Sequence, residues 1–214
     1  MKALFVNCSP RKNWNTQKLL ERAMQGAKDS GAECELVNLY DIAFKGCVSC
    51  FACKLKARKQ DGLCAFKDPL TPILEKARNS DVLVIGSPVY FSYPTAYMRA
   101  FLERFGFPLM DYSGNTNLDR KIQSALIFTM NAPEDIAEKF NYPVLLGANA
   151  TALERLLGNC EVLNVYDTYQ FSDYSRYEAK MFDPDHKAKR RDEQFPIELD
   201  KAYELGKRLV ERAK

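Results

Sequence analysis

Five short runs, separated by segments with helical periodicity, constrain the fold of this sequence more than any other feature. Three of them, residues 3–6, 82–85 and 125–128, are apolar throughout, as in parallel strands buried on both faces. The other two, residues 34–39 and 161–165, alternate between apolar and polar side chains, which indicates the edges of a sheet. Strands that alternate with helices predict an α/β doubly wound sheet.

The burial expected of each run also predicts the order of the strands. The fully apolar strands belong in the centre and the alternating ones at the edges, which gives five parallel strands in the order 2-1-3-4-5 with right-handed crossovers. This is the three-layer, flavodoxin-like arrangement. Ligands of such a sheet lie outside the carboxyl ends of the central strands, beside the switch point between strands one and three.

Composition and charge are those of a single domain over residues 1–214, ending in a helix from about residue 196. Hydrophobic residues make up 46% of the chain, enough for one substantial core. The net charge of +3 is small, and the basic run 187–191 is bracketed by acidic residues, so we expect a solvated helix face and no nucleic-acid partner. No apolar run approaches the roughly 18 residues of a membrane span. We expect a soluble cytoplasmic protein without a membrane partner.

The loop between the first strand and its helix, residues 9–16, is suited to an anion. Unpaired backbone amides and the positive end of the helix dipole converge at such a junction. The loop lacks glycine, so it fits neither a P-loop nor a dinucleotide-binding fingerprint. We interpret it as a phosphate site, with an ordinary helix-capping turn as the alternative. Its candidate ligands are Ser9, Arg11, Asn13, Asn15 and Thr16.

The loops after the third and fourth strands should meet this phosphate loop at the same edge of the sheet. The second loop is uncharged and aromatic, so a ligand with a phosphate at one end and a flat apolar ring at the other would suit the site. FMN is such a ligand. The alternative is that the aromatic residues serve packing alone. The residues concerned are Pro88, Val89, Tyr90 and Phe91 in the second loop and Met130 and Asn131 in the third.

The cysteines give a second chemical signal. Seven of them, an odd number, indicate thiols, metal ligands or redox groups in a reducing compartment. Four lie in an irregular excursion, residues 41–68, that is too long for a plain connector. Two successive C-x-x-C units and one later cysteine supply the donors of a [4Fe-4S] cluster or of structural zinc, with free or redox-active thiols as the remaining interpretation. These four are Cys47, Cys50, Cys53 and Cys64.

Taken together, these motifs resemble the NADPH-dependent FMN reductase family, and most closely its branch that includes the iron-sulfur flavoproteins. The resemblance spans nearly the whole chain. It rests on the polar loop from Ser9 to Thr16, on Ser-Pro-Val-Tyr from Ser87, on the cysteine cluster followed by Lys67-Asp68, and on the tail from Arg190 to Pro196.

The resemblance implies roles for the three loops. The first would hold the FMN phosphate, the segment from Pro88 to Phe91 would cup the isoalloxazine largely through backbone groups, and Met130 and Asn131 would flank the ring. Trp14 stands where family members more often have a small residue, and the gap from Cys53 to Cys64 is longer than in members that carry a cluster. Family members commonly form homodimers or homotetramers with the flavin near a subunit interface.

Three functions remain open at this point. The first is an FMN-dependent oxidoreductase that takes a hydride from NAD(P)H and passes electrons to a small acceptor such as a quinone, a nitro compound or a flavin. The flavin would carry the chemistry, which suits a chain whose single histidine, His186, lies far from the apolar strands. The second is an electron carrier with a [4Fe-4S] cluster on the four cysteines. The third is a non-catalytic, flavodoxin-like binding module with a zinc-stapled loop.

Overall fold

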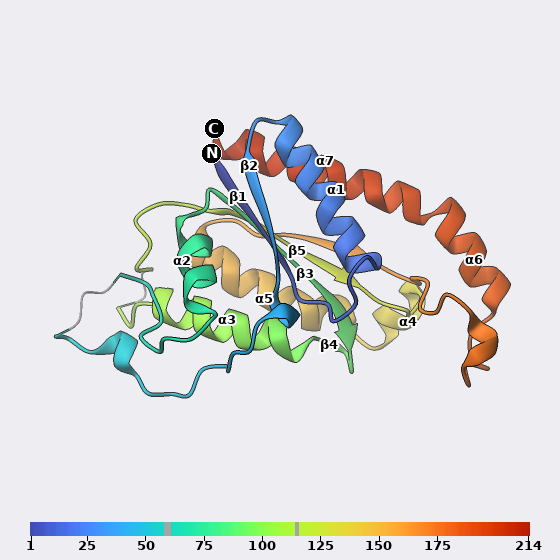
Figure 1. Ribbon diagram of the computed structural model, residues 1–214, viewed down its shortest axis with the longest axis horizontal. Helices are drawn as coiled ribbons and strands as arrows, with labels where there is room; N and C mark the ends of the chain where they lie inside the picture. Colours follow the sequence, from blue (N-terminus) through green and yellow to red (C-terminus); the bar gives the residue numbers. More distant parts are fainter. Residues whose placement is uncertain (58–60, 114–115) are drawn as a thin grey trace.

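A parallel sheet forms the centre of the protein in the computed structural model, which describes residues 1–57, 61–113 and 116–214. The strands run in the order β2-β1-β3-β5-β6, and each of these neighbouring pairs is parallel (Figure 1). The predicted strand order and flavodoxin-like fold class are confirmed. The strands are β1 (Lys2–Asn7), β2 (Glu33–Asn38), β3 (Val82–Tyr90), β5 (Gln123–Thr129) and β6 (Glu161–Val165).

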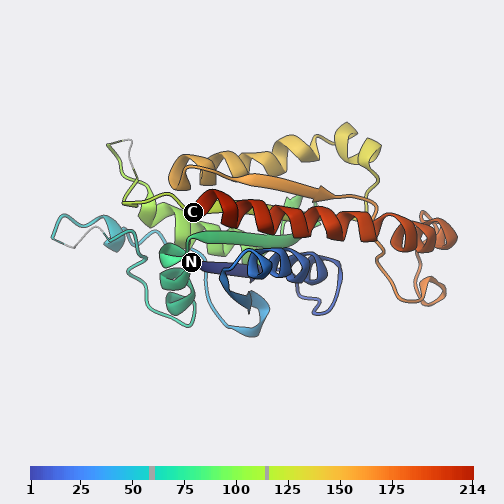
Figure 2. The same cartoon turned by 90° about the horizontal axis from the view of Figure 1, so that it is seen from above.

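Helices cover the two faces of the sheet and produce three layers (Figures 1 and 2). Alternate strand residues face opposite layers: Ala3 and Phe5 pack toward α1 and α7, whereas Leu4 and Val6 pack toward the other helices. One layer holds α1 (Asn15–Asp29) and α7 (Phe195–Ala213). The other holds α2 (Thr71–Asn79), α3 (Ala96–Leu109), α4 (Glu134–Lys139) and α5 (Tyr142–Leu157).

Helices α1 and α7 approach each other through a pair of glycines. A Cβ atom added to Gly26 would lie 2.1 Å from the carbonyl oxygen of Tyr203, and one added to Gly206 would lie 1.9 Å from that of Ala23. Both distances are far below van der Waals contact, so the absence of a side chain at these positions sets the spacing of the two helices. The C-terminal helix, predicted from about residue 196, begins at Phe195.

Two features depart from the sequence-based expectations. The second loop folds back as a hairpin in which β4 (Tyr93–Pro94) pairs antiparallel with β3, a sixth strand that was not predicted. The tail contains a further helix, α6 (Pro184–Glu193), in which the expected solvated face is wrong for Lys187, whose exposed fraction is 2%. Among the residues described, no helix combines the length and the apolar composition needed to cross a membrane.

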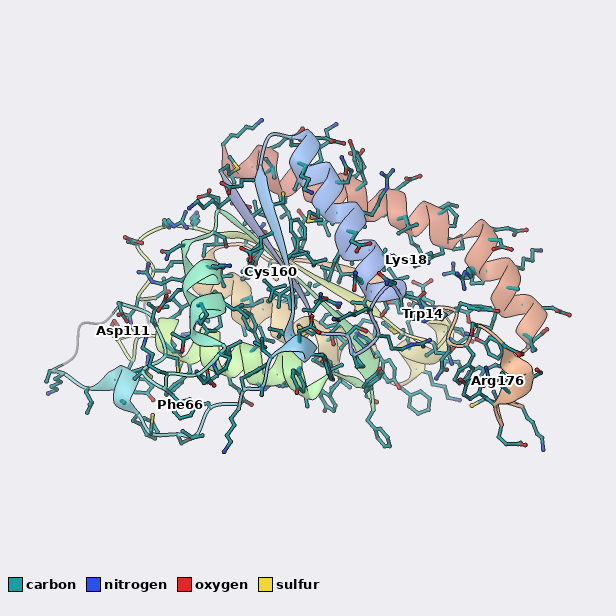
Figure 3. All side chains as sticks on the ribbon, in the orientation of Figure 1. Trp14, Lys18, Phe66, Asp111, Cys160 and Arg176 are labelled. Atoms are coloured by element: carbon teal, nitrogen blue, oxygen red, sulfur yellow. The ribbon has the colours of Figure 1, made fainter. Side chains whose placement is uncertain are left out.

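The cysteine-containing excursion, residues 41–68, has little regular structure where it is described. Its described residues form the end of the 3-10 turn η1 (Leu39–Asp41) and the 3-10 turn η2 (Ala52–Lys54). Residues 58–60, which belong to the predicted excursion, lie outside the described residues. The cysteine-bearing part of the excursion packs against α3, away from the N-terminal end of α1: in Figure 3, Phe66 lies in this region and Trp14 lies at the start of α1. The beginning of the excursion stays near that end, where Asp41 pairs with Lys12.

Candidate functional site

The loop between β1 and α1 owes its shape to hydrogen bonds made by its own side chains. Asn7 Oδ1 accepts from the backbone N–H of Ser9 at 3.1 Å, and Ser9 Oγ accepts from that of Arg11 at 3.1 Å. Asn13 takes the left-handed conformation, with φ of 57°, which asparagine tolerates better than most residues. This conformation lets the loop turn sharply into the helix without glycine. The Asn13 side chain is exposed and accepts a hydrogen bond from Gln17.

The N-terminus of α1 is left without a side-chain cap. Its N-cap residue is Trp14, which makes no side-chain capping bond, and the first turn holds no acidic residue. The first amides of the 15-residue helix are therefore open to an anion, and the helix dipole favours one there. The hydroxyl of Thr16 is buried and pairs with that of Thr129 at 2.7 Å, which joins the start of α1 to the end of β5.

The second wall is the end of β3 and the hairpin that follows it. Phe91 and Ser92 both have positive φ, 50° and 68°, so a two-residue turn of the primed type reverses the chain. Phe91 is fully exposed at its tip. Burial raises the pKa of the Tyr90 phenol, and the charge of Arg11 partly offsets this, so the aromatic wall and the anion loop are electrostatic neighbours.

Thr95, at the N-terminus of α3, holds the first and second loops together. Its hydroxyl donates to the carbonyl oxygen of Cys8 at 2.8 Å, and its backbone N–H donates to Ser87 Oγ at 3.0 Å. Thr95 and Ser87 are both buried. The loop that carries the helix N-terminus and the strand that carries the aromatic wall are thus fixed relative to each other through one residue, Thr95.

The third wall comes from the end of β5. Met130 is buried, and Asn131 is partly buried with its amide nitrogen donating to Gln170 Oε1. The other side-chain atom of Asn131, Oδ1, is buried and has no hydrogen-bond partner. An orphaned buried acceptor is costly unless a ligand or water supplies a donor, so Oδ1 is a candidate acceptor for a ligand N–H or O–H at this wall.

A fourth wall, residues 167–170, was not predicted from the sequence. Trp14 Nε1 and Asn15 Nδ2 both donate to the carbonyl oxygen of Tyr169, at 3.2 and 2.8 Å, and Arg11 Nη1 donates to that of Gln170 at 2.6 Å. Thr168 donates through its N–H and its hydroxyl to the carbonyl oxygen of Met130. The wall follows β6 directly, and the carboxyl end of a fifth parallel strand must reach the same edge of the sheet. The position of this segment directly after the fifth strand was therefore the sequence signal that could have revealed the fourth wall.

The four walls enclose a cavity of about 150 Å³ at the carboxyl ends of the strands. Asn13 and Phe91 do not line it, whereas every other residue predicted for the three loops does. The cavity contains one charged side chain, that of Arg11, and no carboxylate, thiol or imidazole among its described lining residues. Those residues are Ser9, Arg11, Trp14, Asn15, Thr16, Pro88, Val89, Tyr90, Thr129, Met130, Asn131, Thr168, Tyr169 and Gln170.

Larger grooves lie elsewhere on the molecule but lack the features of a ligand site. One of about 410 Å³ lies at the opposite edge of the sheet, beside the start of β1 and β2. Its walls carry charges of both signs, two of which form the ion pair between Lys76 Nζ and Glu35 Oε1, 2.6 Å apart. Another of about 430 Å³ runs between β6 and α7 and is also rich in paired charges. In parallel α/β sheets the carboxyl edge is the ligand-binding one.

The four predicted cysteines line a separate cavity of about 20 Å³ that shares no residue with the first. All seven cysteines of the chain are free thiols. Within the part of the chain that the structure describes, no three cysteine, histidine or carboxylate side chains are placed closely enough to hold a metal ion. The four thiols therefore share one cavity without forming a closed metal centre in this conformation.

Arg104, on α3, organises the cysteine cavity. The residue is 1% exposed, and its guanidinium donates to Cys64 Sγ at 3.0 Å and to both carboxylate oxygens of Asp68, at 2.8 and 3.1 Å. It also donates to the carbonyl oxygens of Lys45 and Phe66. Burial disfavours the charged form, yet the hydrogen bonds to Asp68 and Cys64 raise the pKa of Arg104, so a fixed positive charge lies beside a thiol sulfur.

Solved structures with the same architecture include a quinone oxidoreductase and an FMN-dependent azoreductase. The chain superposes on an NAD(P)H:quinone oxidoreductase from Methanothermobacter marburgensis with a TM-score of 0.70, 17% identity and coverage of 98% of this chain and 96% of the other. It superposes on an FMN-dependent NADH-azoreductase from Bacillus anthracis with a TM-score of 0.65, 12% identity and coverage of 98% and 99%. At these identities the likeness establishes the fold.

The curated sequence relatives are named iron-sulfur flavoproteins. An iron-sulfur flavoprotein from Methanocaldococcus jannaschii is 31% identical over 119 residues, 53% of this chain and 59% of the relative. One from Archaeoglobus fulgidus is 35% identical over 127 residues, 59% of this chain and 58% of the relative. Each match spans less than two thirds of the relative's length.

A family model settles the classification. The model described as NADPH-dependent FMN reductase matches residues 1–132, more than half of the chain. This stretch contains three of the four motifs that carry the family resemblance in the sequence, namely the anion loop, the cysteine cluster and the Ser-Pro-Val-Tyr segment, whereas the tail motif from Arg190 to Pro196 lies beyond it. The chain therefore belongs to the NADPH-dependent FMN reductase family.

Proposed function

We propose that this protein binds FMN in the 150 Å³ cavity and acts as an NAD(P)H-dependent oxidoreductase. The observation that carries the proposal is the meeting of an uncapped helix N-terminus, an aromatic wall and the unpartnered Oδ1 of Asn131 around one cavity. These features match, in turn, a phosphate, a flat ring and a polar ring edge. The family to which the chain belongs supports the same cofactor.

The first turn of α1 would bind the phosphate group of FMN. The amides of this turn, the hydroxyl of Ser9 and the guanidinium of Arg11 supply donors, and Arg11 supplies the compensating charge. Arg11 donates to a neutral carbonyl, that of Gln170, and is exposed enough to reorient. Hydrogen bonds between charged groups are stronger than those to a neutral carbonyl, so a phosphate should attract this side chain away from Gln170.

The ring end falls to Tyr90, Met130 and Asn131. Bound flavin supplies the hydride and electron chemistry, and the protein contributes orientation and local polarity. Met130 offers an apolar, buried surface that excludes water, and Asn131 Oδ1 can accept from a ring N–H. The titratable residues among the cavity residues described above are Arg11, Tyr90 and Tyr169, with no carboxylate or imidazole, which suits a reaction in which no side chain needs to move a proton.

The size of the cavity favours an assembly of several subunits. Small-molecule sites usually enclose roughly 300–1,000 Å³, about twice or more the space enclosed here, so part of the ring would lie beyond the cavity over Tyr90. Phe91 is fully exposed beside it, and Tyr93 is half-exposed. We propose a homodimer or homotetramer in which a second subunit covers this aromatic surface and leaves a slot for a flat acceptor such as a quinone, a nitro compound or a flavin.

Titration with FMN tests the proposal. Arg11→Ala should raise the Kd for FMN roughly ten- to hundredfold, because a charged hydrogen bond contributes about 1.5–3 kcal/mol. Lys12→Ala is the matched control: Lys12 is the adjacent cation, is exposed and pairs with Asp41 at 2.7 Å, so its removal should change the Kd less than threefold. Bound flavin in the wild type should lose its yellow colour when NADPH is added anaerobically. A wild-type protein that takes up no FMN would refute the proposal.

A second candidate function is electron carriage by a [4Fe-4S] cluster, and the shared cysteine cavity is the observation that favours it. Four thiols match the donor set of such a cluster, and the positive charge of Arg104 would offset part of the negative charge of the thiolates. Cys47, Cys50, Cys53 and Cys64 would hold the cluster after drawing closer together. Structural zinc on the same donors is the competing occupant.

Metal and sulfide analysis of anaerobically purified protein distinguishes these occupants. A cluster predicts about four iron and four sulfide per chain, lost in Cys64→Ser and retained in Cys34→Ser, since Cys34 lies outside the cavity. Zinc without sulfide would favour the stapled loop instead. If all four thiols react freely and neither iron nor zinc is present, both metal-based functions are refuted and only the flavin-dependent function remains.

A further inference from the structure

The tail helix α6 places a lysine inside the protein, behind the flavin cavity. Lys187 is 2% exposed although it belongs to a run of charged residues, and it is not itself among the residues that line the cavity. Its Nζ donates to the carbonyl oxygen of Asn131 at 2.8 Å and to Asp167 Oδ1. Asn131 belongs to the third wall and Asp167 begins the fourth, so one ammonium group bridges two walls that lie 36 residues apart in the sequence.

The position of Asp167 depends on the same contacts. It takes a left-handed backbone conformation, with φ of 55°, and its N–H donates to the carbonyl oxygen of Ala132 at 2.9 Å. Burial opposes its ionisation, but the hydrogen bonds from Lys187 and His186 prevail and lower the pKa of Asp167. The carboxylate is therefore a fixed anion, held in a strained turn by the helix that covers it.

Other side chains of α6 reinforce this arrangement. His186 Nε2 lies 2.7 Å from Asp167 Oδ2, and Arg190 donates to the carbonyl oxygen of Tyr166 at 3.1 Å and to Glu198 at 2.7 Å. Arg191 lies over the ring of Tyr169, with its guanidinium carbon 4.9 Å from the ring centroid. The helix thus contacts the fourth wall at several successive residues.

Folding stability alone does not account for a buried lysine here. A buried ion pair pays a desolvation cost that its attraction scarcely recovers, and apolar residues of similar size are often as stable or more so. What an apolar pair cannot do is donate to the carbonyl oxygen of Asn131 and hold it at a fixed distance from Asp167. The pair therefore fixes a geometry, and the side chain of Asn131, which carries the unpartnered Oδ1, is part of that geometry.

We propose that Lys187 is a positioning residue of the flavin site, which sets the orientation of Asn131 and the closure of the fourth wall through its bond to the Asn131 carbonyl. The inference rests on the proposed FMN site and extends it to the C-terminal tail. Lys187 does not touch the ligand in this arrangement. Its effect is transmitted through Asn131 on one side and through residues 167–170 on the other.

Three variants separate positioning from a merely structural role. Lys187→Met removes the donor and leaves Asp167 a buried anion, so both stability and FMN affinity should fall. Lys187→Met combined with Asp167→Asn removes that anion and should recover most of the lost thermal stability, yet it still lacks the donor to Asn131. Lys189→Met, on the exposed face of the same helix, is the matched control.

The measurements are the Kd for FMN, the near-ultraviolet and visible circular dichroism of bound FMN, and the melting temperature without ligand. We expect the Kd to rise at least tenfold in the single and the double variant, with an altered flavin dichroism, and to stay within threefold in Lys189→Met. Recovery of both stability and affinity in the double variant would overturn the inference. An unchanged Kd for FMN in Lys187→Met or in the double variant would overturn it as well. If Lys187→Met does not fold, the double variant decides, and a double variant that also fails to fold would show a structural role and overturn it too. Failure of the wild type to bind FMN would instead refute the proposed function.

Discussion

The close approach of α1 and α7 yields a quantitative test of the packing. Alanine normally stabilises a helix interior by about 1 kcal/mol relative to glycine. At Gly206, however, a Cβ atom would lie 1.9 Å from the carbonyl oxygen and 2.7 Å from the carbonyl carbon of Ala23, both backbone atoms that no rotamer change can move aside. Gly206→Ala therefore requires the helices to separate.

The size of the effect follows from that geometry. The added Cβ would have to move from 1.9 Å to at least 3.4 Å from the Ala23 oxygen, so the two helices must separate by about 1.5 Å. Overpacking of a tight contact costs roughly 1–3 kcal/mol, and we take the upper end because both obstructing atoms belong to the backbone. After the gain in helix propensity, we expect the free energy of unfolding to fall by about 2 kcal/mol. For a chain of this length that corresponds to a drop in Tm of roughly 4–8 °C.

A control with the same chemical change should move in the opposite direction. Gly147 lies inside α5, and beyond its chain neighbours and the adjacent backbone of its own helix no heavy atom lies within 4 Å of a Cβ placed there, so Gly147→Ala should raise the free energy of unfolding by about 0.5–1 kcal/mol. Urea denaturation followed by far-ultraviolet circular dichroism measures both variants. A Gly206→Ala variant as stable as the wild type would show that the helices do not pack as described.

Three further predictions concern the buried charges and the exposed hairpin. Arg104→Met should lower the free energy of unfolding by about 3–5 kcal/mol, because it leaves the Asp68 carboxylate largely buried without its partner. Removal of the exposed Lys67 should lower it by less than about 1 kcal/mol. Urea denaturation measures both variants. Burial raises the pKa of Asp68, but the hydrogen bonds and charge of Arg104 outweigh burial and lower the pKa. Stability should therefore be lost as the pH falls below about 4, and less steeply in Asp68→Asn. Equal pH dependence of the unfolding free energy in the wild type and in Asp68→Asn would contradict this. Phe91→Asn should reduce the oligomer mass in analytical ultracentrifugation without lowering monomer stability, since asparagine accepts a φ of 50° more readily; an unchanged mass would place the interface elsewhere.

Local patterns were sufficient for the sheet and for most of the cavity. The fully apolar runs predicted the central strands because burial on both faces leaves no place for polar residues. The polar loop at residues 9–16 predicted an anion site because a strand that leads into a helix leaves amides unpaired. The role of each residue in binding FMN stays a prediction.

Other features depend on contacts that no local pattern encodes. The β3–β4 hairpin was missed because its turn uses Phe91 and Ser92 at positive φ, where glycine or asparagine is the usual signal. The burial of Lys187 was missed because its partner, Asp167, lies 20 residues earlier and a charge run normally faces solvent.

The fourth wall lies beyond residue 132, where the family match ends. Three sides of the cavity thus come from the region that matches the family, while the remaining side comes from a later segment whose carbonyl oxygens accept hydrogen bonds from Arg11, Trp14 and Asn15. Two proteins alike across their first 132 residues should therefore still differ in how their cofactor site is closed. Grafting the matched region alone onto another C-terminal half would leave the site open on one side, so the two halves of the chain have to be exchanged together.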